Sequence, residues 1–112
     1  MYIKNRAELL THGSLELRAA ALDIVEHALA QVDPYTATKR LVTVSDHTLR
    51  VGNLSFNLAQ RGKIYVLGAG KGSLPIAQAL EDVLGDRIFD SLVIVKEGQE
   101  SCTRHIKLRE AS

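Results

Sequence analysis

A glycine-rich link between an apolar run and a helical pattern constrains this chain more than any other feature. Residues 64–67 (Ile-Tyr-Val-Leu) lead through the segment 68–72 (Gly-Ala-Gly-Lys-Gly) into a pattern that runs to Leu84. A helix entered in this way leaves its first backbone N–H groups unpaired at its partly positive end, where an anion binds. Lys71 adds a full positive charge there. The turn therefore predicts a cradle for a phosphorylated or carboxylated small molecule.

The segments around this turn predict a parallel sheet. Residues 64–67 and 92–95 are continuous apolar runs, typical of strands that are buried on both faces of a parallel sheet. Between them, residues 71–84 form an amphipathic helical pattern. We therefore predict a βαβ unit over 63–96 in an α/β, Rossmann-like fold with flanking helices. The alternation around Ile106 and Leu108 indicates a third, partly exposed strand.

The N-terminal part, residues 5–41, predicts a helical segment. Asn5 and Glu8 form a capping-box pattern, and residues 15–32 carry one apolar stripe at helical spacing. Asp33-Pro34 then ends one helix and starts a short one to about Leu41. After it, alternating residues around the segment 45–48 predict a hairpin, and we expect Phe56 and Leu58 to anchor a loop.

Composition excludes several classes of protein. At 112 residues the chain is one small domain at most, and its net charge of +1 provides no basic stripe for nucleic acid. No apolar run reaches the roughly 20 residues that a membrane span needs. Cys102 is the single cysteine, so an internal disulfide is excluded and a cytoplasmic location is expected. The four histidines lack metal-ligand spacing, so we expect no metal site within this stretch.

Other phosphate-binding patterns fit the turn less well. A P-loop places glycine five residues before its Gly-Lys pair, where this chain has Tyr65, and Ser or Thr after it, where Gly72 stands. The dinucleotide fingerprint requires Gly or Ala at position 73, which is Ser73. This mismatch disfavours a nicotinamide site without removing it. A plain structural turn, with Lys71 solvated, is the remaining alternative.

The chain resembles the two-domain, MOFRL-type D-glycerate 2-kinases of bacteria and archaea, which are often labelled hydroxypyruvate reductases. The resemblance lies in residues 17–41, in Val-Leu-Gly-Ala-Gly-Lys at 66–71 with the helix end at 79–86, and in Leu-Val-Ile-Val-Lys at 92–96. It implies that residues 1–112 are the N-terminal part of a Rossmann-like kinase domain, with the C-terminal remainder absent. Such an enzyme transfers the γ-phosphoryl group of ATP to the 2-hydroxyl of D-glycerate, with Mg as the metal held outside this part.

The resemblance also implies roles for individual residues. Lys71 would be the catalytic lysine, and the surrounding turn would bind phosphate or substrate through Gly68, Ala69, Gly70, Gly72 and Ser73. Lys96 and Gly98 would be loop contacts, although residues 96–99 read Lys-Glu-Gly-Gln where the family has a Lys-Tyr-Gly-His-like segment.

The partners implied are D-glycerate and a nucleotide, with no nucleic acid and no membrane. We also expect uncovered sheet and helix surface to favour a homo-oligomer. Two alternatives stay open at this point: an NAD(P)-dependent hydroxypyruvate reductase, and a non-catalytic α/β binding domain.

Overall fold

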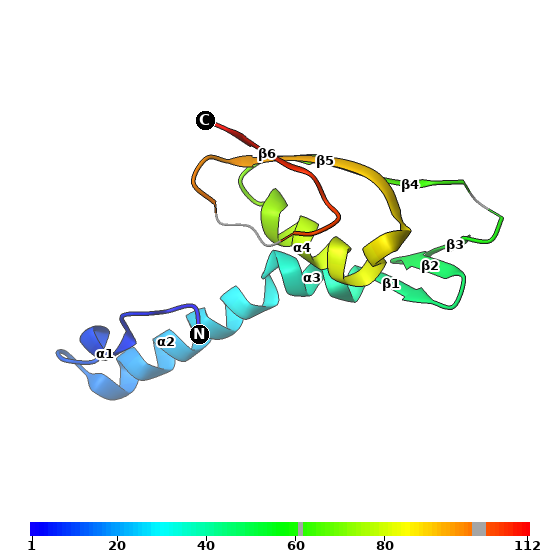
Figure 1. Ribbon diagram of the computed structural model, residues 1–112. Helices are drawn as coiled ribbons and strands as arrows, with labels where there is room; N and C mark the ends of the chain where they lie inside the picture. The colour runs from blue at the N-terminus through cyan, green and yellow to red at the C-terminus, as the bar shows by residue number, and fades with distance from the viewer. Residues whose placement is uncertain (61, 100–102) are drawn as a thin grey trace. The chain divides into compact units, whose positions relative to one another are not determined.

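The computed structural model describes residues 1–60, 62–99 and 103–112, so Cys102 lies outside the described residues. The chain divides into two compact units, Met1–Asp33 and Pro34–Ser112. Figure 1 shows the elements of each unit along the chain. None of the described helices combines the length and the apolar character that a membrane span needs.

The first unit consists of the short helix α1 (Arg6–Leu9) and the long helix α2 (Leu15–Gln31). The helix predicted over 15–32 is therefore confirmed. The unit is held by polar contacts: the Arg6 guanidinium lies 2.6 Å from the Asp23 carboxylate, and the Ile3 N–H donates to Glu26 at 2.9 Å.

Two expectations about this unit need adjustment. The capping-box prediction is wrong, because the Asn5 side chain makes no cap hydrogen bond. The apolar stripe of α2 exists, but none of its residues is buried within the unit, and Ile24 is 70% exposed. Four residues of α1 are too few to cover a helix of 17 residues.

The second unit begins with helix α3 (Pro34–Leu41) and a meander of three strands, β1 (Val42–Ser45), β2 (Thr48–Val51) and β3 (Leu54–Asn57). The strands pair antiparallel in the order β1-β2-β3. The predicted hairpin is confirmed. The loop predicted at Phe56 is wrong, because a second two-residue turn at Gly52 and Asn53 returns the chain along β2, where Phe56 pairs with Leu49.

A three-stranded parallel sheet forms the rest of this unit. Its elements are β4 (Ile64–Ala69), α4 (Ser73–Leu84), the 3-10 turn η1 (Gly85–Arg87), β5 (Ile88–Lys96) and β6 (Leu108–Ala111). The strands lie in the order β4-β5-β6, each pair parallel. The predicted α/β class and the third strand are confirmed, although that strand begins at Leu108. Helix α4 starts at Ser73 rather than at the predicted Lys71, because Lys71 and Gly72 belong to the turn.

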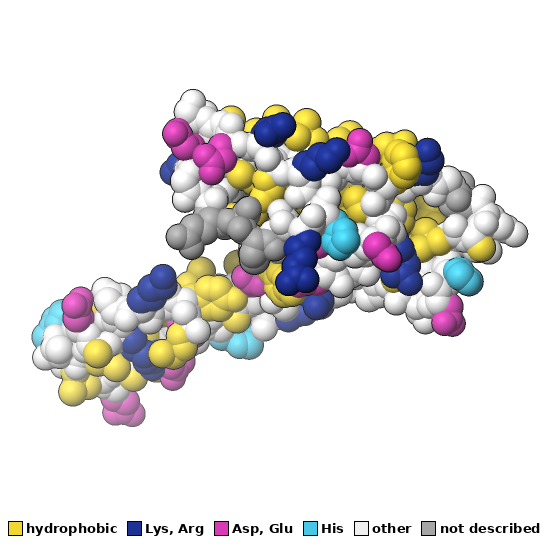
Figure 2. All heavy atoms as spheres, viewed as in Figure 1, with side chains coloured by type: hydrophobic (Ala, Val, Ile, Leu, Met, Phe, Trp, Pro, Cys, Tyr) yellow, Lys and Arg dark blue, Asp and Glu magenta, His cyan; other side chains and the backbone are white. Residues whose placement is uncertain are grey.

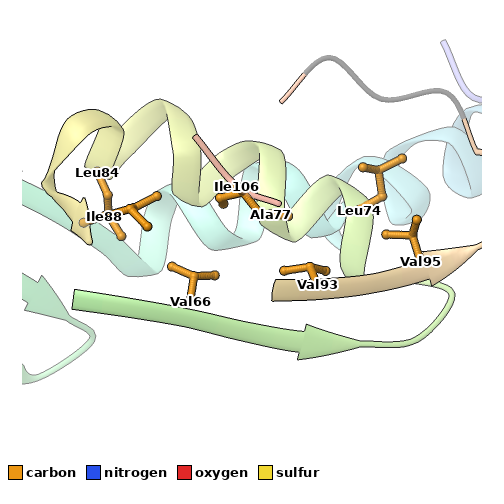
Figure 3. Packing of buried hydrophobic residues seen from close by; sticks show 8 residues of the cluster. All are labelled: Val66, Leu74, Ala77, Leu84, Ile88, Val93, Val95 and Ile106. Carbon is orange, nitrogen blue, oxygen red and sulfur yellow. The ribbon is translucent and has the colours of Figure 1, made fainter. Parts of the chain in front are cut away.

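The core lies between α4 and one face of this sheet. Figure 3 shows side chains from α4 and from the strands meeting there, together with Ile106 just before β6. The buried set is Val66, Leu74, Ala77, Leu84, Ile88, Val93, Val95 and Ile106. Full burial of an aliphatic side chain of this size contributes roughly 1.5–3 kcal/mol, so this layer is the main stabilising element of the unit.

The opposite face of the sheet is open within the described chain. The expectation that the strands are buried on both faces is wrong: Leu67 is 78% exposed and Tyr65 58% exposed, whereas Val66 between them is buried. Figure 2 shows hydrophobic side chains on the surface along the sheet, at the top of the view. Helix α4 covers one face only, and the described residues of this unit supply no second helix for the other.

Candidate functional site

The carboxyl ends of the three parallel strands meet at one edge of the sheet. β4 ends at Ala69, β5 at Lys96 and β6 at Ala111. A hollow of about 210 Å³ opens at this edge, lined by Gly70, Lys71, Ile94, Val95, Lys96, Ala111 and Ser112. In open α/β sheets, ligands bind outside the carboxyl ends of the strands. Of the predicted site residues, Lys71, Gly70 and Lys96 come together in this hollow.

The turn from β4 to α4 is held against β5 by its own hydrogen bonds. The Gly70 N–H donates to the Ile94 carbonyl at 3.1 Å, and the Ser73 N–H donates to the Gly70 carbonyl at 3.1 Å. The Ser73 hydroxyl lies 2.6 Å from the Gly70 carbonyl oxygen and 3.1 Å from that of Ile94. These contacts give Ser73 a structural part in the turn, and a role in binding phosphate stays a prediction.

The same turn leaves donors available at Lys71 and Gly72. Both residues are exposed, and neither backbone N–H has a hydrogen-bond partner in the described ranges. The Lys71 ammonium likewise has no ion pair or hydrogen bond with any described residue. Two amides and one cation at the start of a helix of 12 residues form an environment suited to an anion.

Only one glycine of the turn is required by backbone conformation. Gly70 has φ of +123°, which side-chain-bearing residues rarely adopt. Gly72 has φ of −90°, and a Cβ there would meet no atom within 4 Å, while a Cβ at Gly68 would make an ordinary 3.7 Å contact with Val93. Ala69 is exposed at the end of β4. The strict demand for glycine therefore lies at Gly70.

A side chain that the sequence analysis did not single out joins this turn to the loop after β5. The Gln99 side-chain oxygen accepts from the Lys96 N–H at 3.0 Å, and its side-chain nitrogen donates to the Lys71 carbonyl at 3.3 Å. Gly98, with φ of +81°, lets the chain turn back so that Gln99 reaches these partners. Lys71 and Gln99 are 28 positions apart, so no local pattern indicates this contact.

Glu81 is a second residue that the sequence analysis missed. Its carboxylate accepts the N–H groups of Arg104 at 2.8 Å, His105 at 2.5 Å and Ile106 at 2.9 Å. Burial raises the pKa of Glu81, but these backbone hydrogen bonds outweigh burial and hold the pKa below its ordinary value of 4.5. The carboxylate thereby orders the segment that leads into β6 and so to the hollow.

A larger hollow of about 410 Å³ lies beside β4 and the first half of α4. Its lining is Val66, Leu67, Gly68, Ala69, Gly72, Ser73, Ile76, Ala77, Leu80 and Val93. No charged side chain lines it, so the smaller hollow with its two lysines is the better candidate for an anion.

Fold and turn together define an α/β domain with a glycine-rich strand-to-helix turn at the carboxyl edge of its parallel sheet. Residues 20–112 match the family described as "Domain of unknown function (DUF4147)". The chain belongs to this family, and the resemblance to the glycerate 2-kinase family is confirmed.

A curated protein and a solved structure, both from Pyrococcus horikoshii, agree with this assignment. The chain is similar to a glycerate 2-kinase from Pyrococcus horikoshii, with 33% identity over 98 residues that cover 88% of this chain and 21% of that protein. It is also similar to a solved structure, the PH0495 protein from Pyrococcus horikoshii OT3, with 33% identity and a TM-score of 0.71 over 86% of this chain and 21% of that one. The chain thus spans 21% of the length of the relatives that it matches.

Proposed function

We propose that the protein containing this chain is a kinase that transfers the γ-phosphoryl group of ATP to the 2-hydroxyl of D-glycerate, giving 2-phosphoglycerate. In this proposal the chain supplies the phosphate-binding turn. The observation that carries it is the exposed Lys71 at the carboxyl edge of a parallel sheet. Beside it lie the amides of residues 71 and 72, which have no hydrogen-bond partner among the described residues. The glycerate 2-kinase relative supports the choice of reaction.

Phosphoryl transfer suits this arrangement for a physical reason. Negative charge spreads over the equatorial oxygens of the transferred group in the transition state, and a protein contributes mainly by placing positive charge and donors around it. Lys71 would meet these oxygens, with the amides of Lys71 and Gly72 as further donors. Gly70 and Ser73 would hold the turn in shape. We include a cytoplasmic location in the proposal.

The resemblance implies that Mg is held outside this part of the protein, and the described residues do not fit a metal site of their own. Among residues 1–60, 62–99 and 103–112, no group of three or more His, Cys, Asp and Glu side chains could hold a metal ion. We therefore derive no step through Mg from this chain.

The proposal is tested with the complete protein, by following release of ADP from ATP in the presence and absence of D-glycerate. Lys71→Ala should lower kcat by roughly 10²–10³-fold, the loss typical when one donor to a developing oxyanion is removed. Lys4→Ala is the matched control, because Lys4 is also exposed and lies outside the turn. Turnover that is equal in Lys71→Ala and wild type would remove the lysine from the mechanism.

Two assays on the same complete protein distinguish the alternatives. A change in nicotinamide absorbance with hydroxypyruvate, without ADP release from ATP and glycerate, would identify a reductase instead. Absence of both reactions would favour a binding domain without catalysis.

A further inference from the structure

We propose that Gln99 is a positioning residue that holds Lys71 and the loop of Lys96 together as one site for a phosphate chain. The inference rests on the proposed function, in which Lys71 binds phosphate oxygens. It adds a residue and a ligand class to that site, namely an anion with at least two phosphate groups, such as inorganic pyrophosphate or the phosphates of a nucleotide.

The first step of the argument is how little else holds Lys71. Its neighbours in the turn are tied to β5, since Gly70 and Ser73 both contact the Ile94 carbonyl. Lys71 itself has one hydrogen-bond partner among the described residues, the side-chain nitrogen of Gln99 at 3.3 Å from its carbonyl oxygen. Among the described residues, the contact from Gln99 is thus the hydrogen bond that holds the backbone of Lys71 itself.

The second step is the state of Gln99 itself. Its side chain is partly buried, its oxygen is occupied by the Lys96 N–H at 3.0 Å, and its own N–H closes the loop by donating to the Lys96 carbonyl at 3.3 Å. A glutamine amide held at both ends has a fixed orientation, because one end only accepts and the other only donates. The Gln99 amide therefore fixes the Lys71 carbonyl relative to the backbone of Lys96.

The third step concerns the ligand. Lys71 and Lys96 line one hollow of about 210 Å³. Two cations brought to the same small space repel one another unless an anion lies between them, and the attraction to that anion grows with its charge. A phosphate chain satisfies both lysines at once, whereas a single carboxylate carries too little charge for both.

A double-mutant cycle tests the inference in the complete protein, with inorganic pyrophosphate as the probe and titration calorimetry as the readout. Gln99→Met keeps the side-chain length and removes both hydrogen bonds. We expect it to weaken pyrophosphate binding about three- to tenfold, the usual effect of losing neutral hydrogen bonds. In the Lys71→Ala background the same change should have a smaller effect, because the ammonium that Gln99 positions is gone while the backbone amides and Lys96 remain. Gln60→Met is the matched control, an exposed glutamine elsewhere in the same unit.

Each outcome decides between the two hypotheses. If Lys71→Ala weakens binding but Gln99→Met does not, or if the Gln99 change has an equal effect in both backgrounds, the positioning role is wrong and the proposed function stands. If Lys71→Ala leaves pyrophosphate binding and turnover unchanged, Lys71 has no part in the site and the positioning role is wrong, whereas absence of ADP release in the wild-type protein overturns the proposed function itself. Should Gln99→Met not fold, Gln99→Leu serves in its place, since it removes both hydrogen bonds and adds no charge next to the anion. A loss of affinity in Gln99→Leu that is smaller in the Lys71→Ala background supports the inference, and full affinity overturns it.

Discussion

The carboxylate of Glu81 offers the sharpest test of how the segment before β6 is held. Glu81→Gln keeps the size of the side chain and removes its charge. Three backbone amides lie within 2.5–2.9 Å of this carboxylate. A hydrogen bond to a charged group contributes about 1.5–3 kcal/mol and one to a neutral group about 0.5–1.5 kcal/mol. The difference over three bonds gives an upper limit near 3–5 kcal/mol for the stability lost in Glu81→Gln.

Solvent lowers that limit, because Glu81 is only partly buried and the amides of Arg104 and His105 belong to exposed residues. The amide of the buried Ile106 has the least access to water as a substitute partner. We therefore expect a loss of about 1.5 kcal/mol in the free energy of unfolding. For a unit of this size the midpoint of thermal unfolding should fall by roughly 6–12 °C at neutral pH.

The stability difference between wild type and Glu81→Gln depends on pH, and the direction of the pKa shift decides how. The folded-state pKa of Glu81 lies below the ordinary 4.5, so the carboxylate stabilises the fold above that pH and the contribution disappears as pH falls through the lowered pKa. Wild type and Glu81→Gln should differ at pH 7 and converge in acid. Circular dichroism melts across this range measure both, with Glu110→Gln as control, because Glu110 is exposed and its side chain has no hydrogen bond or ion pair in the described chain. Equal melting of Glu81→Gln, Glu110→Gln and wild type at pH 7 would refute the reasoning.

Two further substitutions test the turn and the open face of the sheet. Gly70→Ala places a side chain at φ of +123° and should lower the free energy of unfolding by about 1–3 kcal/mol, whereas Gly72→Ala, at φ of −90°, should leave it nearly unchanged. Denaturant titration measures both variants, and equal losses would contradict the assignment of strain to Gly70. Leu67→Ser removes an apolar side chain that is 78% exposed, so it should leave stability almost unchanged and reduce self-association. Light scattering at rising concentration tests this, with Leu54→Ser in the antiparallel sheet as control, and a wild-type chain that stays monomeric would count against it.

Much of the fold was predictable because its signals are local. The helical periodicity of α2 and α4, the Asp33-Pro34 junction and the alternation in β1 and β2 each act within a few residues. The prediction that the apolar strands are buried on both faces was wrong, because burial depends on which elements pack against the sheet. An apolar run such as 64–67 shows that a strand can be covered on both faces, yet the described unit covers one of them.

The same division applies to the candidate site. The glycine turn and the lysine at its end follow from the order of residues 68–72, since a helix start and its cation are neighbours in the chain. Gln99 and Glu81 reach partners 28 and 23–25 positions away, and such contacts exist only after the sheet has brought the loops together. The sequence by itself therefore determined the glycine turn with its lysine and the class of the fold. Tertiary structure alone decided which side chains hold that turn and the strand beside it, because a hydrogen bond between distant residues depends on packing that no local pattern encodes.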